Sequence, residues 1–276
     1  MSRILVLGST GMLGHKMLER LRLHYTDVIG FSRANGFDAR DAVESIVAIS
    51  RYRPAVVVNC IGIIKQRPQD AEESITINAL FPQSLQHHCE KLWGARLIHF
   101  STDCVFSGNR GNYTEQDFPD PRDLYGRTKL LGEVSEGSAL TLRTSIIGRE
   151  RVNGHGLLEW FLRQTGSIPG YTNAIFSGVT TNWLADLVST LIRRHASLRG
   201  LYHVAANPIS KLHLLELMQE AYGRFDIRIV PSSVQPFCDR SLDATKFRLA
   251  TWMSTPDLEN ILFNQMEEDK ESGYAL

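Results

Sequence analysis

Short apolar runs with little polar alternation recur through the first half of the chain. They lie at residues 3–8, 27–31, 54–62, 96–102 and 139–148. Runs of this kind are typical of strands that are buried on both faces of a parallel sheet. The segments between them carry the spacing of amphipathic helices, which we expect at 11–24, 38–50, 71–94 and 124–137. Gly94 is a suitable helix stop.

Strand and helix patterns alternate over roughly the first 150 residues. This alternation is typical of an α/β fold with a doubly wound parallel sheet of Rossmann type, joined by right-handed crossovers. The alternation weakens afterwards, and residues 231–243 have the composition of an extended segment. We therefore expect a sheet domain over residues 1–150 and a smaller C-terminal lobe over 151–276, interleaved with the end of the sheet.

Composition and charge narrow the function classes. The chain has 276 residues, of which 43% are hydrophobic and 22% charged, and Lys+Arg and Asp+Glu both total 30. This balance gives no reason to expect a nucleic-acid or membrane partner. The four cysteines show no zinc spacing, so no metal site is expected. The start of the chain lacks a signal-peptide core, and the longest apolar stretch, 55–64, is too short to span a bilayer. We expect a soluble cytoplasmic protein with reduced thiols.

A glycine-rich turn follows the first expected strand. The segment GSTGMLG places Gly8, Gly11 and Gly14 between a buried strand and an amphipathic helix. The N-terminus of such a helix offers backbone N–H groups and the positive end of its dipole, which suit a pyrophosphate. A tight turn that simply needs glycine is the alternative. The expected cofactor contacts of this loop are Gly8, Thr10, Gly11, Met12, Leu13 and Gly14.

The end of the second strand bears on which dinucleotide would bind. An acidic residue there would bind the ribose hydroxyls of NAD, but this chain has Ser32 and then Arg33. A hydroxyl and a guanidinium suit a 2′-phosphate, so NADP(H) is favoured and NAD(H) is the other option. A solvated surface arginine is the alternative for Arg33. Asp38 is expected either to meet the adenine edge or to cap a helix.

A tyrosine and a lysine lie four residues apart on the helix expected at 124–137. Residues at this spacing share a helix face, so Tyr125 and Lys129 can point to one place. A nearby ammonium would lower the phenol pKa, and the tyrosine could then donate a proton to a carbonyl oxygen. An ordinary surface pair is the alternative.

Polar residues at the end of the fourth strand add to this pair. Ligands bind at the carboxyl edge of an open parallel sheet, and Ser101, Thr102 and Asp103 lie there. Thr102 can donate a hydrogen bond to the same carbonyl oxygen as the tyrosine. A turn or a helix cap is the alternative for this segment.

Four motifs carry a resemblance to a known family. GSTGMLG, STDCVFSG, YGRTK and LRTS, in this order, resemble an extended short-chain dehydrogenase/reductase. Within that superfamily, the last three are most similar to the dTDP-4-dehydrorhamnose reductase group. The resemblance covers residues 3–148 well and continues more faintly through TNAIFSGVTT, GLYHVAA and DRSLD. It implies a Rossmann-type NAD(P)-binding domain and a C-terminal lobe that holds a nucleotide sugar. The implied reaction is reduction of the 4-keto group of a nucleoside-diphosphate 6-deoxyhexose, in surface polysaccharide precursor synthesis.

The resemblance also assigns roles to residues. It makes Thr102, Tyr125 and Lys129 the catalytic triad, with Tyr125 as proton donor and Lys129 on the nicotinamide ribose. The residues that would line the cofactor are Asn59, Cys60, Ile61 and Gly62, with Arg143, Thr144 and Ser145 beyond the nicotinamide. Asn173 and Arg240 would contact the substrate, with Arg240 at its diphosphate. A surface salt bridge is the alternative for Arg240.

The chain departs from this group at two loops, and other functions remain open. NCIGIIKQ replaces a loop of small residues, so Lys65 and Gln66 lie near the site without an assigned role. TNAIFSGVTT also differs from the usual pattern on the sugar side. A nucleotide-sugar epimerase of the same fold and a non-catalytic dinucleotide-binding regulatory subunit are the alternatives. Trp160 and Phe161 are expected either in the core or at a homodimer interface.

Overall fold

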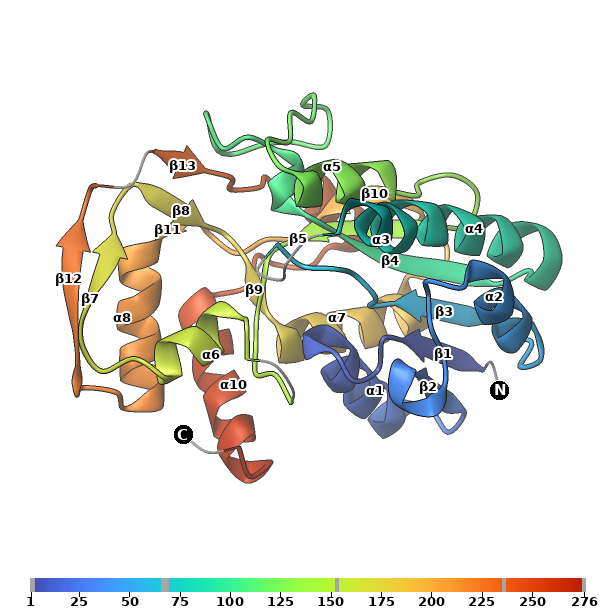
Figure 1. Ribbon diagram of the computed structural model, residues 1–276, viewed down its shortest axis with the longest axis horizontal. Coiled ribbons are helices and arrows are strands. Elements are labelled where there is room, and N and C mark those ends of the chain that lie inside the picture. Colours follow the sequence, from blue (N-terminus) through green and yellow to red (C-terminus); the bar gives the residue numbers. More distant parts are fainter. Residues whose placement is uncertain (1–2, 66–69, 152–153, 235–236, 275–276) are drawn as a thin grey trace.

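A parallel sheet of six strands, in the order β10-β5-β4-β3-β1-β2, is the central feature of the computed structural model (Figure 1). Its strands are β1 (Ile4–Leu7), β2 (Val28–Phe31), β3 (Val56–Asn59), β4 (Arg96–Thr102), β5 (Leu140–Thr144) and β10 (Gly200–His203). Every neighbouring pair is parallel, which confirms the predicted doubly wound α/β class. The structure describes residues 3–65, 70–151, 154–234 and 237–274.

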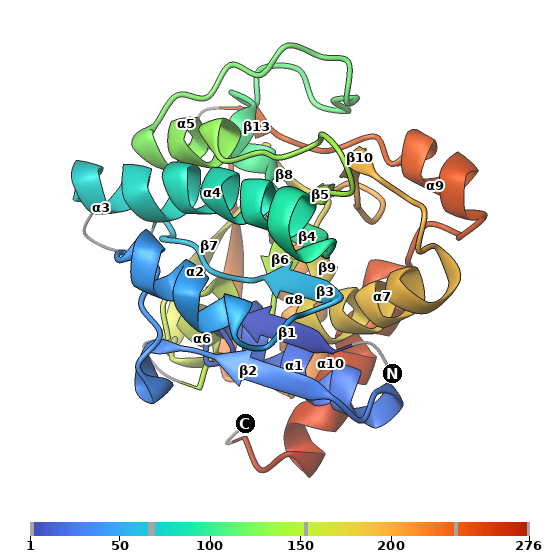
Figure 2. The ribbon, with the colours of Figure 1, turned by 90° about the vertical axis from the view of Figure 1, so that its right-hand side faces the viewer.

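Helices cover both faces of this sheet (Figures 1 and 2). One face carries α1 (Met12–His24) and α7 (Thr181–Arg194), which pack on each other. The other face carries α2 (Ala42–Ser50), α5 (Leu124–Leu131) and one long helix. This helix consists of α3 (Ala71–Ile75), the π-helical η2 (Thr76–Leu80), α4 (Phe81–His88) and the π-helical η3 (Cys89–Trp93). It confirms the helix predicted at 71–94, and Gly94 ends it in the left-handed conformation, with φ 61°.

Two of the predicted helices are shorter in the structure. The helix predicted at 38–50 begins at Ala42, because the Asp41 carboxylate accepts a hydrogen bond from the Glu44 N–H and caps it. The helix predicted at 124–137 ends at Leu131. The next residue, Gly132, lies so close to the long helix that a Cβ there would overlap the Asn78 carbonyl oxygen. The chain therefore leaves α5 at a contact that only glycine fits.

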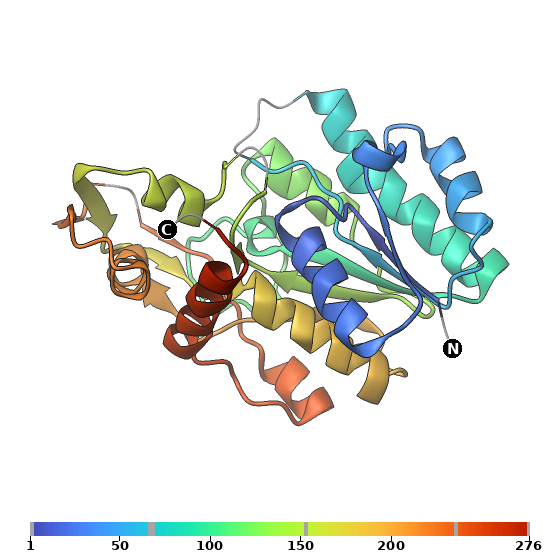
Figure 3. The ribbon, with the colours of Figure 1, turned by 90° about the horizontal axis from the view of Figure 1, so that it is seen from below.

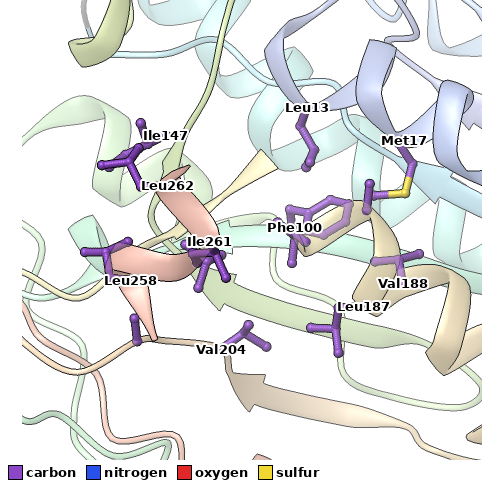
Figure 4. Close-up of a cluster of buried hydrophobic side chains, with 14 of the residues drawn as sticks. Leu13, Met17, Phe100, Ile147, Leu187, Val188, Val204, Leu258, Ile261 and Leu262 are labelled. Atoms are coloured by element: carbon purple, nitrogen blue, oxygen red, sulfur yellow. The ribbon is translucent and has the colours of Figure 1, made fainter. Parts of the chain in front are cut away.

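Two buried apolar clusters lie on the two faces of the sheet. Successive side chains of a strand point to opposite faces, so Ile4 and Val6 of β1 enter one cluster and Leu5 and Leu7 enter the other. Figure 4 shows the first cluster, which joins α1, β4, α7 and the C-terminal helix α10 (Leu258–Glu271) through Leu13, Phe100, Val188 and Leu262. The C-terminal helix is therefore part of the same core as the sheet.

Most of the remaining elements form a smaller lobe at the left of Figure 1. They are α6 (Leu157–Leu162), β7 (Gly166–Tyr171), β8 (Ala174–Phe176), β11 (Ile209–Ser210), α8 (Lys211–Tyr222), β12 (Ile227–Ser232) and β13 (Cys238–Asp239). β7 pairs with β12, and β8 pairs with β11 and β13. In the segment predicted to be extended, 231–243, the described residues contribute the end of β12 and the short β13 to these sheets.

The C-terminal half also contributes to the sheet domain. β10 extends the main sheet beyond β5, and α9 (Thr245–Thr251) packs against it. Two short strands, β6 (Ile146–Ile147) and β9 (Val179–Thr180), pair with each other just before α7. Among the helices that the structure describes, none combines the length and the apolar character that a membrane span needs.

We expect the first core cluster to depend on α10. Replacing Leu262, which is 0% exposed, by Ala removes buried contacts and should lower the free energy of unfolding by about 2–5 kcal/mol. Leu249→Ala is the control, because Leu249 of α9 is 69% exposed and its truncation should change stability by less than about 0.5 kcal/mol. Urea unfolding of both variants measures the difference, and equal effects would contradict the packing described for α10.

Candidate active site

The turn between β1 and α1 is shaped by contacts between backbone atoms. Gly8 adopts φ 78°, and its N–H donates to the Phe31 carbonyl at 2.8 Å. The Gly11 N–H donates to the Gly8 carbonyl at 2.9 Å. A Cβ at Gly14 would overlap that same carbonyl oxygen, so glycine is required for α1 to approach β1 this closely.

The N-terminus of α1 fits an anion. Its N-cap is Gly11, no side-chain cap is seen there in the described part of the chain, and its first turn contains no acidic residue. The backbone N–H groups of the first turn have no partner within a helix, and the helix dipole is positive at this end. The predicted contacts of this loop, which include Thr10, Met12 and Leu13, therefore line a cradle of the kind that holds a pyrophosphate.

The end of β2 presents the two residues that bear on the cofactor. Arg33 is exposed at the first position of the short η1 helix (Arg33–Asn35), whereas Ser32 is buried, and its N–H donates to Asn35 Oδ1 at 2.8 Å. Asp38 pairs with Arg40, with Nε and Oδ2 2.9 Å apart, and this hydrogen bond lowers the pKa of the carboxyl. Asp41 is the cap of α2, so the capping role considered for Asp38 is wrong.

Tyr125 and Lys129 lie on α5, at the carboxyl end of β4. The Asp123 carboxylate accepts a hydrogen bond from the Gly126 N–H at 2.8 Å and begins the helix. A Cβ at Gly126 would overlap the Cys104 carbonyl oxygen, so α5 packs directly on η4 (Asp103–Val105). Lys129 is 5% exposed, and its Nζ donates to the Phe100 carbonyl at 2.7 Å.

Burial dominates the electrostatics of this pair. It raises the pKa of Tyr125, the Cys104 thiol acts in the same direction, and a hydrogen bond with Thr102 acts in the opposite one. Burial also lowers the pKa of Lys129 to about 8. The lowered phenol pKa that the residue spacing predicts is wrong for the protein alone, because loss of solvent outweighs the nearby charges. Tyr125 is therefore protonated at neutral pH.

Thr102 lies at the end of β4 and makes local contacts. Its Oγ1 donates to Asp103 Oδ1 and accepts from the Cys104 N–H, each at 3.1 Å, so it caps η4, as in the alternative interpretation of this segment. The same hydroxyl also contacts the Tyr125 phenol. Burial raises the pKa of the Asp103 carboxyl, while the charge of Arg240 opposes this effect.

The Ser101 hydroxyl lies in a buried contact within the protein, and its predicted role in substrate binding stays a prediction. Neighbouring residues of a strand point to opposite faces, and the Ser101 hydroxyl donates to Glu133 Oε1 at 2.6 Å. Glu133 forms a buried ion pair with Arg143, in which both nitrogen–oxygen distances are 2.7 Å. Arg143 is therefore held by Glu133 within the protein. The Thr144 hydroxyl donates to the carbonyl of Ser145 at 3.2 Å.

The loop after β3 lies between the glycine turn and α5. A Cβ at Gly8 would lie 3.0 Å from Ile61 Cγ1, and one at Gly62 would lie 4.0 Å from Lys129 Nζ. Asn59 Oδ1 accepts from the Ile61 N–H at 3.1 Å, which shapes the start of this loop. Burial raises the pKa of the Cys60 thiol, so it is protonated. The structure therefore brings this predicted cofactor loop beside both other parts of the site.

Two supporting contacts could not be recognised in the sequence. Asn78, in the π-helical η2, accepts from the Ile63 N–H at 2.8 Å and donates to the Ile63 carbonyl and to Thr128 Oγ1. It therefore ties the loop after β3 to α5. Lys65 forms an ion pair with Asp123, the cap of α5, at 2.6 Å. Gln66 lies outside the described residues. The π-helical form of η2, which carries Asn78, is of a kind often found at functional sites, but no residue pattern in the chain predicts it.

Two residues that the sequence analysis assigns to the substrate, Arg240 and Asn173, lie in or beside the strands of the lobe. Arg240 follows β13, and its Nε donates to the Phe106 carbonyl at 2.9 Å. Burial lowers the pKa of Arg240, but the nearby groups Cys104, Cys238, Asp103 and Asp123 outweigh it, so the pKa is raised above its ordinary value. Asn173 lies beside β13, because its carbonyl accepts from the Cys238 N–H, but its side-chain amide donates to the Ser233 carbonyl at 3.3 Å.

The fold and the order of the site motifs define an extended short-chain dehydrogenase/reductase. Residues 1–246 match the family described as the RmlD substrate binding domain, and the chain belongs to this family. It is 34% identical over 213 residues to a dTDP-4-keto-6-deoxy-D-glucose reductase of Streptomyces niveus. This alignment covers 73% of this chain and 72% of the relative. It is also 28% identical over 269 residues to methionine adenosyltransferase 2 subunit beta of Danio rerio. This alignment covers 85% of this chain and 78% of the relative.

A solved structure supports the fold. The chain superimposes on a dTDP-4-dehydrorhamnose reductase of Bacillus anthracis in complex with NADP with a TM-score of 0.85 and 23% identity. The match covers 97% of this chain and 99% of that chain. At this identity the likeness establishes the Rossmann-type architecture, including the C-terminal lobe.

We expect Lys129 to titrate near pH 8 in the protein without ligand. Its ordinary pKa is 10.5, and burial lowers it to about 8, so the ammonium is charged below this pH and neutral above it. Nuclear magnetic resonance of protein with ¹³C-labelled lysine can follow the Cε signal, and Lys129→Met assigns it by its loss. A Lys129 signal that moves only near pH 10.5 would contradict the buried position.

Proposed function

We propose that the protein is an NADPH-dependent reductase of the 4-keto group of a nucleoside-diphosphate 6-deoxyhexose. The observation that carries this proposal is the cluster of Thr102, Tyr125 and Lys129 beside the glycine turn and the loop after β3. Relatives named as reductases of dTDP-linked keto sugars support the same reaction class. The proposed setting is surface polysaccharide precursor synthesis in the cytoplasm, and a relative named as a spore coat polysaccharide biosynthesis protein supports the pathway.

In this proposal the chain holds the carbonyl oxygen and gives it a proton. A bound reduced nicotinamide would supply the hydride for carbon 4. Tyr125 is protonated at rest, so it can donate its proton to the oxygen as negative charge develops there. Thr102 would contribute a second hydroxyl to the same oxygen when its proton turns from Asp103 to the substrate. The charged form of Lys129 stabilises the phenolate that remains and binds the nicotinamide ribose.

The remaining predicted contacts are part of the proposal. Arg33 and Ser32 would favour the 2′-phosphate of NADPH over the diol of NADH. Arg240 would bind the diphosphate of the sugar nucleotide, because a guanidinium matches phosphate oxygens. Asp103 and Asn173 would contact the sugar. Phe161 is 0% exposed and belongs to the core, whereas Trp160 is 39% exposed and remains a candidate for a homodimer contact.

A regulatory subunit is the second candidate function. The similarity to methionine adenosyltransferase 2 subunit beta favours it, because that relative is named as a subunit. The residues argue for catalysis, since Tyr125, Lys129 and Thr102 are all present and grouped. An epimerase of the same fold would return its hydride to the sugar, so net consumption of NADPH separates it from the reductase.

Tyr125→Phe is expected to lower turnover by about 10²–10⁴-fold while leaving NADPH affinity within about twofold. The assay follows the loss of NADPH absorbance with a panel of 4-keto-6-deoxy nucleotide sugars made in situ by dehydratases. Tyr52→Phe is the control, because it removes a hydroxyl before β3, at the opposite edge of the sheet. No turnover of any sugar by the wild type, despite NADPH binding, would shift the assignment to the regulatory subunit.

Arg33→Ala is expected to lower the preference for NADPH over NADH by about tenfold or more, because it removes a charge-assisted hydrogen bond to the 2′-phosphate. The ratio of kcat/KM for the two cofactors, with one sugar held saturating, measures this effect. Arg51→Ala removes an exposed arginine from the end of α2 and should leave the ratio unchanged. An unchanged ratio in Arg33→Ala would mean that Arg33 is only a surface residue.

A further inference from the structure

The residues just after α10 are turned back against α1 by a defined helix end. The Gly273 N–H donates to the Lys270 carbonyl, and the Tyr274 N–H donates to the Asp269 carbonyl, each at 3.1 Å. Gly273 has φ 74°, and this pair of hydrogen bonds around a left-handed glycine is a Schellman motif. The motif ends α10 and reverses the chain, so the Tyr274 hydroxyl reaches His15 of α1. Figure 3 shows this end of the molecule from below.

A chain of two hydrogen bonds runs from this tyrosine to the glycine turn. The Tyr274 hydroxyl lies 2.9 Å from His15 Nε2, and His15 Nδ1 lies 2.9 Å from the Gly11 carbonyl oxygen. A carbonyl only accepts, so Nδ1 carries the ring proton and Nε2 accepts from the phenol. Burial lowers the pKa of His15, which agrees with the neutral ring that this arrangement requires.

The ring of Tyr274 lies beside two cationic side chains, those of Lys16 and Arg149. Lys16 of α1 places its Nζ 5.7 Å from the ring centroid, and Arg149 places its Cζ 4.9 Å from it. Arg149 in turn pairs with Glu159 of α6, with Nε and Oε1 2.8 Å apart. Cation–π contacts at such distances fix the ring in one place, so the hydroxyl has a set direction toward His15.

We propose that Tyr274 is a positioning residue for dinucleotide binding, acting through His15 on the Gly11 carbonyl at the N-cap of α1. This inference rests on the proposed function, because it assumes that the glycine turn holds a dinucleotide. Gly11 has no side chain to hold it, so the turn must be ordered by other contacts. A turn that is ordered before binding loses less conformational entropy when the ligand arrives, and affinity rises accordingly.

The test uses the full chain and three variants. Tyr274→Phe removes only the hydroxyl. His15→Asn keeps an amide donor near the Nδ1 position and loses the acceptor for Tyr274. Tyr25→Phe is the matched control, because the Tyr25 hydroxyl donates to the Ser189 carbonyl at 3.0 Å from the other end of α1. The measurements are NADPH dissociation constants from fluorescence titration, amide hydrogen exchange at residues 10–13, thermal unfolding, and kcat at saturating NADPH.

Tyr274→Phe and His15→Asn should each raise the NADPH dissociation constant about 3–10-fold, the range expected for one neutral hydrogen bond. Their combination should be no worse than either alone, because both break the same chain. Exchange at residues 10–13 should be faster in these variants than in Tyr25→Phe, at similar melting temperatures. The kcat at saturating NADPH should stay within about twofold of the wild type, because the reacting groups are untouched.

Three outcomes would overturn the proposal, and they can be told apart. If the wild type binds NADPH and Tyr274→Phe binds it equally well, Tyr274 only packs the C-terminus and the proposed function stands. The same holds if Tyr25→Phe weakens NADPH binding by the same factor, since the effect is then general loosening of α1. If the wild type binds neither NADPH nor NADH, the glycine turn holds no dinucleotide, and the proposed function fails together with this inference.

Discussion

All six strands of the central sheet run in the same direction, and the site depends on this constraint. The segments after β1, β3 and β4 must leave from one edge, so the glycine turn, the loop at Gly62 and Thr102 meet there. Both faces of the sheet are covered by helices, so polar groups at this edge are withdrawn from solvent. The same geometry that collects Tyr125 and Lys129 also shifts the pKa values of both.

The site also depends on the close approach of α1 and α5 to the backbone of neighbouring elements. A Cβ at Gly14, Gly126 or Gly132 would overlap a carbonyl oxygen of a neighbouring element. These glycines allow α1 to approach β1, and α5 to approach η4 and the long helix, without intervening side chains. Because α5 is held at both ends by such contacts, Tyr125 and Lys129 have little freedom to move relative to β4. Rigid placement of this kind suits the proton transfer proposed for Tyr125.

The sequence predicts the sheet well because buried parallel strands have a simple signature, an unbroken apolar run. β10 was missed because Gly200–His203 is short and mixed in character, and it becomes a strand only by pairing with β5. Motifs predict the grouping of Thr102 and Tyr125, because the fold brings the ends of β4 and α5 together. Side-chain direction and burial are tertiary properties, so the hydrogen bond from Ser101 to Glu133 and the raised phenol pKa could not be foreseen. The spacing of Tyr125 and Lys129 predicts how close the two groups lie on the helix. It does not predict how much water surrounds them, and this loss of water sets their pKa values.

Lys129 shows what this burial means for ligand binding. Its ammonium is nearly inaccessible to solvent, and Glu133, which would stabilise the charge, is already paired with Arg143. The hydrogen bond to the Phe100 carbonyl uses one of the three ammonium donors. A ligand that brings hydroxyl oxygens beside Nζ would replace part of the lost hydration, and the charged form would then become more favourable. Loss of water makes the charged form of Lys129 less stable in the free protein. A polar ligand that restores these contacts would therefore bind more tightly.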